Sequence, residues 1–125
     1  MHDLVYKNAE NAAASLDAYL GHVADDVILM PNNATVIEGK AAYRKHIEDS
    51  LPHGQLVLRH ELIAIYPFQD LVVARGRAIG TFTARGETTA HPFETKNIFL
   101  FRRSADGLKV WQIIFNHSPV SPAAP

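Results

Sequence analysis

The chain has 125 residues, of which 47% are hydrophobic and 20% charged, and its formal net charge is -1. This length and composition predict one globular domain, and the near-neutral charge favours neither nucleic acid nor an anionic membrane as a partner. The lack of cysteine excludes disulfides, thiolate metal sites and cysteine nucleophiles. Residues 1–4 do not open a secretory signal and no apolar run is long enough to span a membrane, so we expect a cytoplasmic protein.

The first fifty residues predict helices. Apolar residues at helical spacing indicate helices over residues 3–14, 16–23 and 40–50. The pair Asp25-Asp26 is expected to end the second of these helices, because short acidic side chains compete with the backbone for hydrogen bonds.

A hairpin is predicted between the last two helices. Residues 27–30 are typical of a short buried strand, and Pro31-Asn32-Asn33 is a strong turn signal. Residues 35–38 are expected to return as the second arm.

The rest of the chain predicts an antiparallel meander. Strand-like runs separated by turn residues cover residues 55–66, 71–84, 88–103 and 108–118. Helices followed by strands predict the α+β class. We assign residues 1–118 to a single domain and residues 119–125 to a proline-rich tail.

Turn types predict the register of the last strands. An Asp-Gly turn with a glycine bulge would pair Ser104 with Leu108. On that register the opposed residues are Phe101 and Trp111, Phe99 and Ile113, Asn97 and Phe115, and Thr95 and His117. A two-residue turn at Arg85-Gly86 would place Asn97 opposite Ala74 and Thr95 opposite Gly76.

Side chains alternate between the faces of a strand, so one face can be assigned to a pocket. Its predicted hydrophobic lining is Tyr6, Tyr19, Met30, Phe82, Phe99, Phe101, Trp111, Ile113 and Phe115. Asn97 and His117 are polar interruptions of this face, and His60 joins them if the strand ends near Pro67 keep the required parity. Gly76 and Gly80 add little bulk, which means either that the strand bends there or that a ligand has room beside it.

The opposite face of the predicted sheet is not fully polar. It carries Ile98, Val110 and Ile114 beside charged residues. Because the predicted helices are too few to cover both faces, we expect a homodimer through the sheet.

Four segments resemble the nuclear transport factor 2-like superfamily, in its ketosteroid-isomerase-like and SnoaL-like branch. They are residues 24–31, 37–40, 106–113 and 116–118, and the similarity extends over nearly the whole chain. The resemblance implies a cone-shaped, strongly curved mixed or antiparallel sheet of about six strands, wrapped around N-terminal helices as a cystatin-like α+β barrel. It also implies a pocket inside the cone and commonly a dimer.

The catalytic groups of ketosteroid isomerase do not carry over to this sequence. The region where the general-base aspartate follows the Ala-Asp-Asp segment reads Met30-Pro31, and the position of the protonated aspartate corresponds to Phe99. Tyr6 lies one residue out of step with the oxyanion tyrosine. Tyr19 and Tyr43 are expected to pack helices with their hydroxyls at the surface. Steroid-isomerase chemistry would therefore need a different base.

Three residues are candidates for catalysis, each with a structural alternative. His60 is either a general base or acid, or a core histidine bonded to a backbone carbonyl. His117 either binds substrate or forms a structural or dimer contact. Asn97 either orients a ligand oxygen or ties down a bulge at His91-Pro92.

The sequence predicts an isomerase, dehydratase or cyclase that acts on a small hydrophobic, oxygen-bearing molecule by proton transfer. The alternative is a non-catalytic module of the same fold that binds a ligand or drives dimerisation. The seven histidines include no His-x-His or His-x-x-x-His pair, so we expect no metal, and the chemistry needs no cofactor.

Overall fold

The computed structural model describes residues 4–5 and 16–120. Its elements are β1 (Leu4–Val5), β2 (Val23–Met30), β3 (Ile37–Glu38), α2 (Lys40–Ser50), the 3-10 helix η1 (Leu51–His53), β4 (Gly54–Phe68), β5 (Leu71–Ala84), β6 (His91–Ser104) and β7 (Gly107–Ser118). Residues 16–20 are also helical. None of the helices in these residues is long and apolar enough to cross a membrane.

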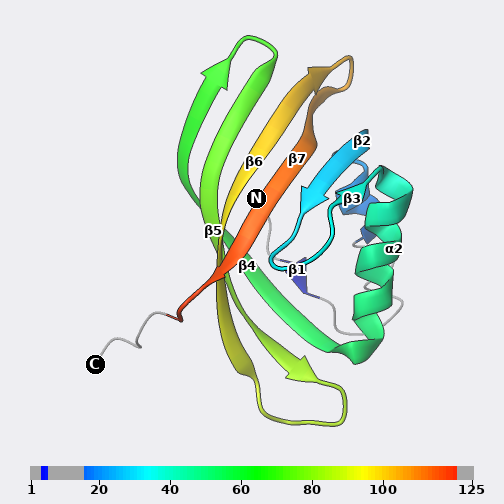
Figure 1. Ribbon diagram of the computed structural model, residues 1–125, viewed down its shortest axis with the longest axis vertical. Helices are drawn as coiled ribbons and strands as arrows, with labels where there is room; N and C mark the ends of the chain where they lie inside the picture. The colour runs from blue at the N-terminus through cyan, green and yellow to red at the C-terminus, as the bar shows by residue number, and fades with distance from the viewer. Residues whose placement is uncertain (1–3, 6–15, 121–125) are drawn as a thin grey trace.

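The fold is a strongly curved mixed sheet with helices on its concave side (Figure 1). The strand order is β1-β4-β5-β6-β7-β2-β3, and every pair is antiparallel except β2 with β7. This arrangement confirms the α+β class and the curved sheet. The sheet is not closed into a barrel, because among the described strands β1 and β3 remain at its two edges.

The helices pack on the concave face through a compact apolar core. Its members are Leu16, Leu20, Val23, Val27, Leu29, Tyr43, Ala74, Phe99, Val110 and Ile113. Leu16, Val23 and Val27 are fully buried, which stabilises the fold by roughly 1.5–3 kcal/mol for each such side chain. The core joins residues 16–29 to α2, β5, β6 and β7, and so closes one end of the concave side of the sheet.

The third predicted helix and the hairpin before it are confirmed. Helix α2 covers residues 40–50, and Gly39 precedes it with φ 93°, a conformation that glycine adopts without strain. Strands β2 and β3 pair antiparallel, with Leu29 opposite Ile37.

The predictions for the first two helices need correction. Residues 4–5 form β1 against β4 rather than part of a helix, and residues 6–14 lie outside the described residues. The second helix ends at residue 20, so Asp25 and Asp26 lie within β2. A register shift between Val23 and Ile28 turns both carboxylates outward, where charged partners hold them.

The predicted β6–β7 register is confirmed in the centre of the two strands and is wrong near the turn. Phe99 pairs with Ile113 and Thr95 with His117, but Ser104 pairs with Gly107. A bulge at residue 111 restores the register by adding one residue to β7. Because the bulge reverses the facing of residues beyond it, Val110 is buried in the core rather than on the outer face.

The β5–β6 register differs from the prediction by two residues. Asn97 pairs with Gly76 rather than Ala74, and Thr95 pairs with Ala78 rather than Gly76. The Arg85-Gly86 turn forms, with the Glu87 N–H donating to the Ala84 carbonyl, but β6 begins only at His91, so residues 87–90 lie between the turn and the strand and shift the pairing. A shift of two keeps every side chain on its predicted face.

Candidate functional site

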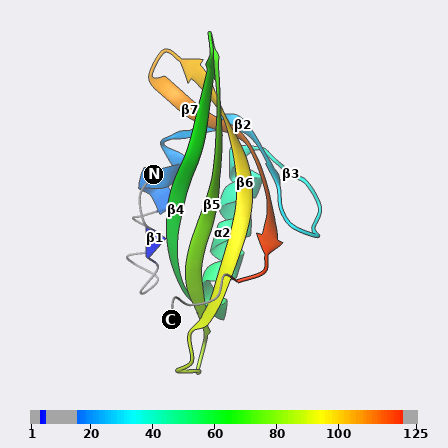
Figure 2. The same cartoon turned by 90° about the vertical axis from the view of Figure 1, so that its left-hand side faces the viewer.

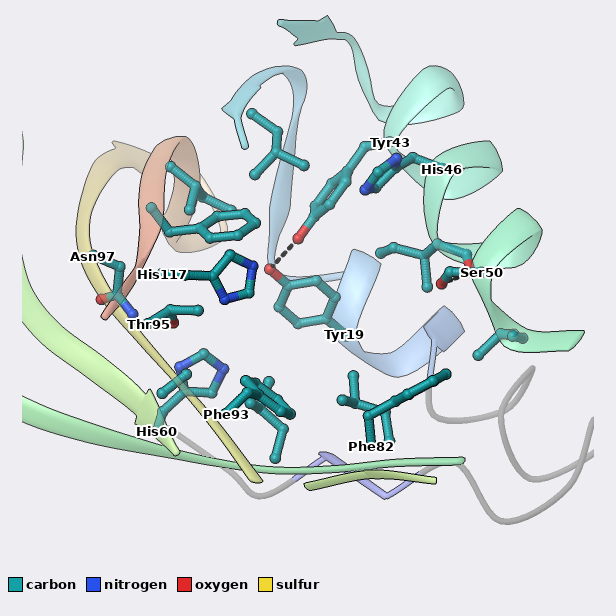
Figure 3. Close-up of a pocket in the computed structure, with 18 of the residues that line it drawn as sticks. Tyr19, Tyr43, His46, Ser50, His60, Phe82, Phe93, Thr95, Asn97 and His117 are labelled. Carbon is teal, nitrogen blue, oxygen red and sulfur yellow. Dashed lines mark hydrogen bonds between the residues drawn. The ribbon is translucent and has the colours of Figure 1, made fainter. Parts of the chain in front are cut away.

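A cavity of about 400 Å³ lies between the concave face of the sheet and the helices (Figure 3). Its lining comes from all parts of the described chain: Tyr19, Leu29, Tyr43, His46, Ile47, Ser50, Leu51, Gly54, Leu56, Leu58, His60, Ala78, Phe82, Phe93, Thr95, Asn97, Phe99, Ile113, Phe115 and His117. Most of this surface is apolar, and its size suits a small organic molecule.

His60 and His117 both line the cavity, and they stand at the two ends of one row of paired residues that runs across the sheet. His60 on β4 is paired with Ala78 on β5, which is paired with Thr95 on β6 and through it with His117 on β7. Three strand spacings separate the two histidine backbones, about 14 Å along the sheet. Since Ala78 and Thr95 are small, the row leaves space between the two imidazoles, where a ligand can lie.

Aromatic neighbours hold both imidazoles in place. The ring of His60 meets Phe99 edge-on at 5.9 Å between centroids, and that of His117 meets Phe115 in the same way at 6.4 Å. The backbone N–H of His117 donates a hydrogen bond of 3.2 Å to Asn32 Oδ1. The β2–β3 turn thereby anchors the end of β7 on which His117 lies.

Asn97 lies two residues along β6 from Thr95, in the next row of paired residues, between Gly76 and Phe115. Its side chain is 7% exposed and lines the cavity. Figure 3 places it beside Thr95, at the same end of the cavity as His60 and His117. We call the four residues His60, Thr95, Asn97 and His117 the polar end of the cavity.

A pair of tyrosines faces the polar end from the helices. The hydroxyl oxygens of Tyr19 and Tyr43 are 2.9 Å apart and share a hydrogen bond, and their rings meet at 76°. Both residues line the cavity, and Figure 3 draws the hydrogen bond between their hydroxyls. The expectation that these hydroxyls lie at the surface is therefore wrong, because the curved sheet closes over the inner faces of the helices.

Eight of the residues assigned to the site from the sequence line this cavity. They are Tyr19, His60, Phe82, Asn97, Phe99, Ile113, Phe115 and His117. Tyr6 lies outside the described residues.

Met30, Phe101 and Trp111 do not line the cavity. Met30 follows Leu29 on β2, and alternation turns it to the other face. Phe101 stacks on Phe99 and packs against the core. Trp111 is the bulged residue of β7, with the guanidinium of Arg102 5.0 Å from its ring centroid.

Helix α2 supplies lining residues that were not assigned from the sequence. Tyr43, His46, Ile47 and Ser50 line the cavity at positions i, i+3, i+4 and i+7. This spacing is the signature of one helix face, and the sequence therefore contained the signal. Phe93 also lines the cavity, and alternation from Thr95 and Asn97 places it on the same face, so the sequence contained that signal as well.

The outer face of the sheet carries an ion-pair network. Glu61 accepts a hydrogen bond of 2.8 Å from Arg77 and also lies 3.1 Å from Arg59. The hydrogen bond from Arg77 to Glu61 raises the pKa of that arginine further above its usual range. Among the described residues, no three His, Cys, Asp or Glu side chains form a group that could hold a metal ion.

The family model described as SnoaL-like domain matches residues 6–113, which is most of the chain. The chain is a SnoaL-like domain. The superfamily inferred from the four sequence segments is thus confirmed. No curated protein sequence matches this SnoaL-like domain.

Solved structures share the fold of this SnoaL-like domain at low sequence identity. A ketosteroid isomerase-like protein from Erwinia carotovora atroseptica has a TM-score of 0.75 at 21% identity, over 86% of this chain and 85% of that one. An NTF2-like protein with a cystatin-like fold from Novosphingobium aromaticivorans has a TM-score of 0.69 at 18% identity, over 87% and 74%.

A third similar structure is named for an assembly role. It is a putative Ca/calmodulin-dependent kinase II association domain from Exiguobacterium sibiricum, with a TM-score of 0.67 at 10% identity, over 87% of this chain and 82% of that one. At these identities the likeness shows the fold alone. The fold family includes isomerases and other ligand-binding proteins, so function has to be argued from the cavity.

Proposed function

We propose that this SnoaL-like domain is an isomerase, dehydratase or cyclase that transfers a proton within a small hydrophobic, oxygen-bearing substrate. The observation that carries the proposal is the pair His60 and His117, which face one apolar cavity from opposite strands. An imidazole is the side chain best suited to give and take protons near neutral pH. The ketosteroid isomerase-like name of one structural neighbour agrees with this class of chemistry.

Each polar residue of the cavity has a separate role in the proposed proton transfer. One histidine takes a proton from a carbon next to a carbonyl group; the electron pair of that C–H bond forms a carbon–carbon double bond, and the π pair of the carbonyl moves onto its oxygen. The hydrogen-bonded hydroxyls of Tyr19 and Tyr43 stabilise the oxygen as it becomes negative. The protonated imidazole then returns the proton, either to another carbon or to a leaving hydroxyl. Asn97 orients an oxygen substituent of the substrate.

Deuterium exchange tests this proposal without knowledge of the natural substrate. The protein is mixed with 2-tetralone, a two-ring ketone, in D2O, and loss of the α-proton signal is followed by NMR. We expect exchange faster than with free imidazole at the same concentration. His60→Gln or His117→Gln is expected to lower the rate about 100-fold, the usual contribution of a positioned base.

The matched control is His91→Gln. His91 is exposed on β6 and does not line the cavity, so its replacement should leave the rate unchanged. Exchange no faster than with imidazole, or unchanged rates in both cavity variants, would refute the catalytic proposal.

A second function, association through the sheet, is favoured by the outer face. Ile98 and Ile114 are cross-strand neighbours there and are 40% and 44% exposed. Figure 2 looks onto this face, and no described element covers it. We propose that two copies pair through it, since apolar residues grouped on an open sheet face mark an interaction site.

A further inference from the structure

The side-chain amide oxygen of Asn97 is buried and has no hydrogen-bond donor among the described residues. Oδ1 is buried and accepts no hydrogen bond from any residue that the structure describes. In Figure 3 the nitrogen of this amide is the atom turned toward the cavity, and the oxygen is turned away. A buried acceptor without a donor is costly, so native proteins rarely leave one unpaired.

The surroundings of the oxygen show why it finds no donor. Oδ1 lies 3.4 Å from the place that a Cβ of residue 76 would take, and the backbone oxygen of Glu61 lies 2.5 Å from that same place. The amide oxygen is thus directed toward a region that already holds another acceptor.

Rotation of the amide about its Cβ–Cγ bond exchanges the two atoms. This torsion is soft and roughly two-fold, and nitrogen and oxygen occupy nearly the same space. After the rotation the N–H bonds point toward the Glu61 carbonyl region, and Oδ1 faces the cavity. The cavity then presents an acceptor at its polar end, and a ligand has to supply the donor.

We infer that the substrate of this cavity carries a hydroxyl group, an alcohol or a phenol, that donates its proton to Asn97 Oδ1. The inference rests on the proposed function and names the substrate class of the same cavity. A hydroxyl both donates and accepts, so an imidazole N–H at the polar end can donate to its oxygen. An ether in the same place accepts only and leaves Oδ1 unpaired.

The apolar lining sets the orientation of such a ligand. Phe82 lies at the opposite side of the cavity from Asn97 in Figure 3, and Ile47 and Leu51 also line the cavity from α2 and η1. The hydrocarbon body therefore points toward Phe82, α2 and η1, with the hydroxyl at Asn97. Asn97 is then the residue that determines specificity for the hydroxyl.

Three two-ring probes test the inference: 2-naphthol, 2-methoxynaphthalene and naphthalene. Their affinities for the full chain are measured by calorimetry or by NMR titration. We expect 2-naphthol to bind about tenfold more tightly than 2-methoxynaphthalene, the usual effect of one paired hydrogen bond. The side-chain amide signals of Asn97 should shift with 2-naphthol and not with naphthalene.

Two variants test whether Asn97 causes the preference for 2-naphthol. Asn97→Leu should reduce the preference for 2-naphthol to less than about threefold, since a leucine offers no acceptor. Ser50→Ala is the control, because Ser50 lines the cavity but already donates to the Ile47 carbonyl at 2.7 Å. It should keep the preference.

The outcomes separate the inference from the proposed function. Equal binding of the three probes by the unaltered protein would overturn the hydroxyl inference and leave the pocket function standing. A preference for 2-naphthol that survives Asn97→Leu would show that another group receives the hydroxyl, and would also overturn it. If none of the probes binds, the proposed function fails and the inference fails with it.

Discussion

At the scale of single residues, Asp26 shows how a charge stabilises an irregular part of the sheet. Its carboxylate accepts two hydrogen bonds from Arg102, of 2.6 and 3.1 Å, and the same guanidinium lies over the ring of Trp111. These contacts tie the bulged part of β2 to β6, which lies two strands away. The hydrogen bond from Arg102 holds the pKa of Asp26 below its ordinary value of 3.8.

The lowered pKa of Asp26 predicts a pH dependence of stability. In acid the unfolded chain binds the proton more readily than the folded chain, so the stabilisation is present above pH 3.8 and is lost as the pH falls through the lower folded pKa. We expect Asp26→Asn to remove this contribution to the pH dependence of the free energy of unfolding between about pH 5 and pH 2. Urea unfolding at several pH values measures it.

The partner of Asp26 offers an independent check. Arg102→Gln should flatten the same slope, because the carboxylate then loses its hydrogen-bond donor. A slope that stays as steep in both variants as in the unaltered protein would mean that the pair does not couple folding to protonation.

At the scale of elements, the glycines of β5 allow two strands to approach closely. A Cβ at Gly76 would lie 2.5 Å from the backbone oxygen of Glu61, and one at Gly80 would overlap the backbone oxygen of Val57. Both oxygens belong to β4, not to the cavity. Of the two interpretations of these glycines, the structure supports bending of the strand rather than room for a ligand.

Gly80 is therefore expected to be intolerant of substitution. Gly80→Ala should lower the free energy of unfolding by about 1–3 kcal/mol, because the new methyl group can fit only if β4 moves away. Thr81→Ser, one residue along the same strand, should change it by less than about 0.5 kcal/mol. Chemical denaturation compares the three proteins, and equal stabilities of Gly80→Ala and Thr81→Ser would contradict the close approach.

At the scale of the whole molecule, the two faces of the sheet have different roles. The concave face is closed by helices and encloses the cavity, whereas the outer face combines ion pairs with exposed isoleucines. Figure 2 shows that none of the described helices and strands lies over this outer face. The proposed pairing of two copies through this face would bury these isoleucines and so lower the free energy of the surface.

The dimer is tested by mass in solution. We expect light scattering to report about twice the chain mass of 13.8 kDa, and Ile98→Glu with Ile114→Glu to reduce it to one chain. Leu108→Glu is the matched control, since Leu108 is 41% exposed at the β6–β7 turn. A single-chain mass for the unaltered protein would exclude pairing through the sheet.

The sequence by itself determined the parts of this protein that depend on near neighbours. The bounds of α2 follow from helical spacing, and the meander follows from alternation between turn residues. The placement of Asn97 and His117 on one face also follows from alternation, because a shift of two residues between β5 and β6 does not change the facing of side chains. His60 reaches the same face only through the register shift between Leu62 and Ala64, since the Phe68–Leu71 pairing continued without that shift would put His60 opposite Ile79.

Only the tertiary structure decided what depends on contacts between distant segments. The parallel pairing of β2 with β7, the strand at residues 4–5 and the bulge at Trp111 are settled by how the sheet closes on the helices. The same closure brings the hydroxyls of Tyr19 and Tyr43 into the cavity from two helices. Local propensity cannot predict these features, because their free energy comes from surfaces that meet only once the chain is folded.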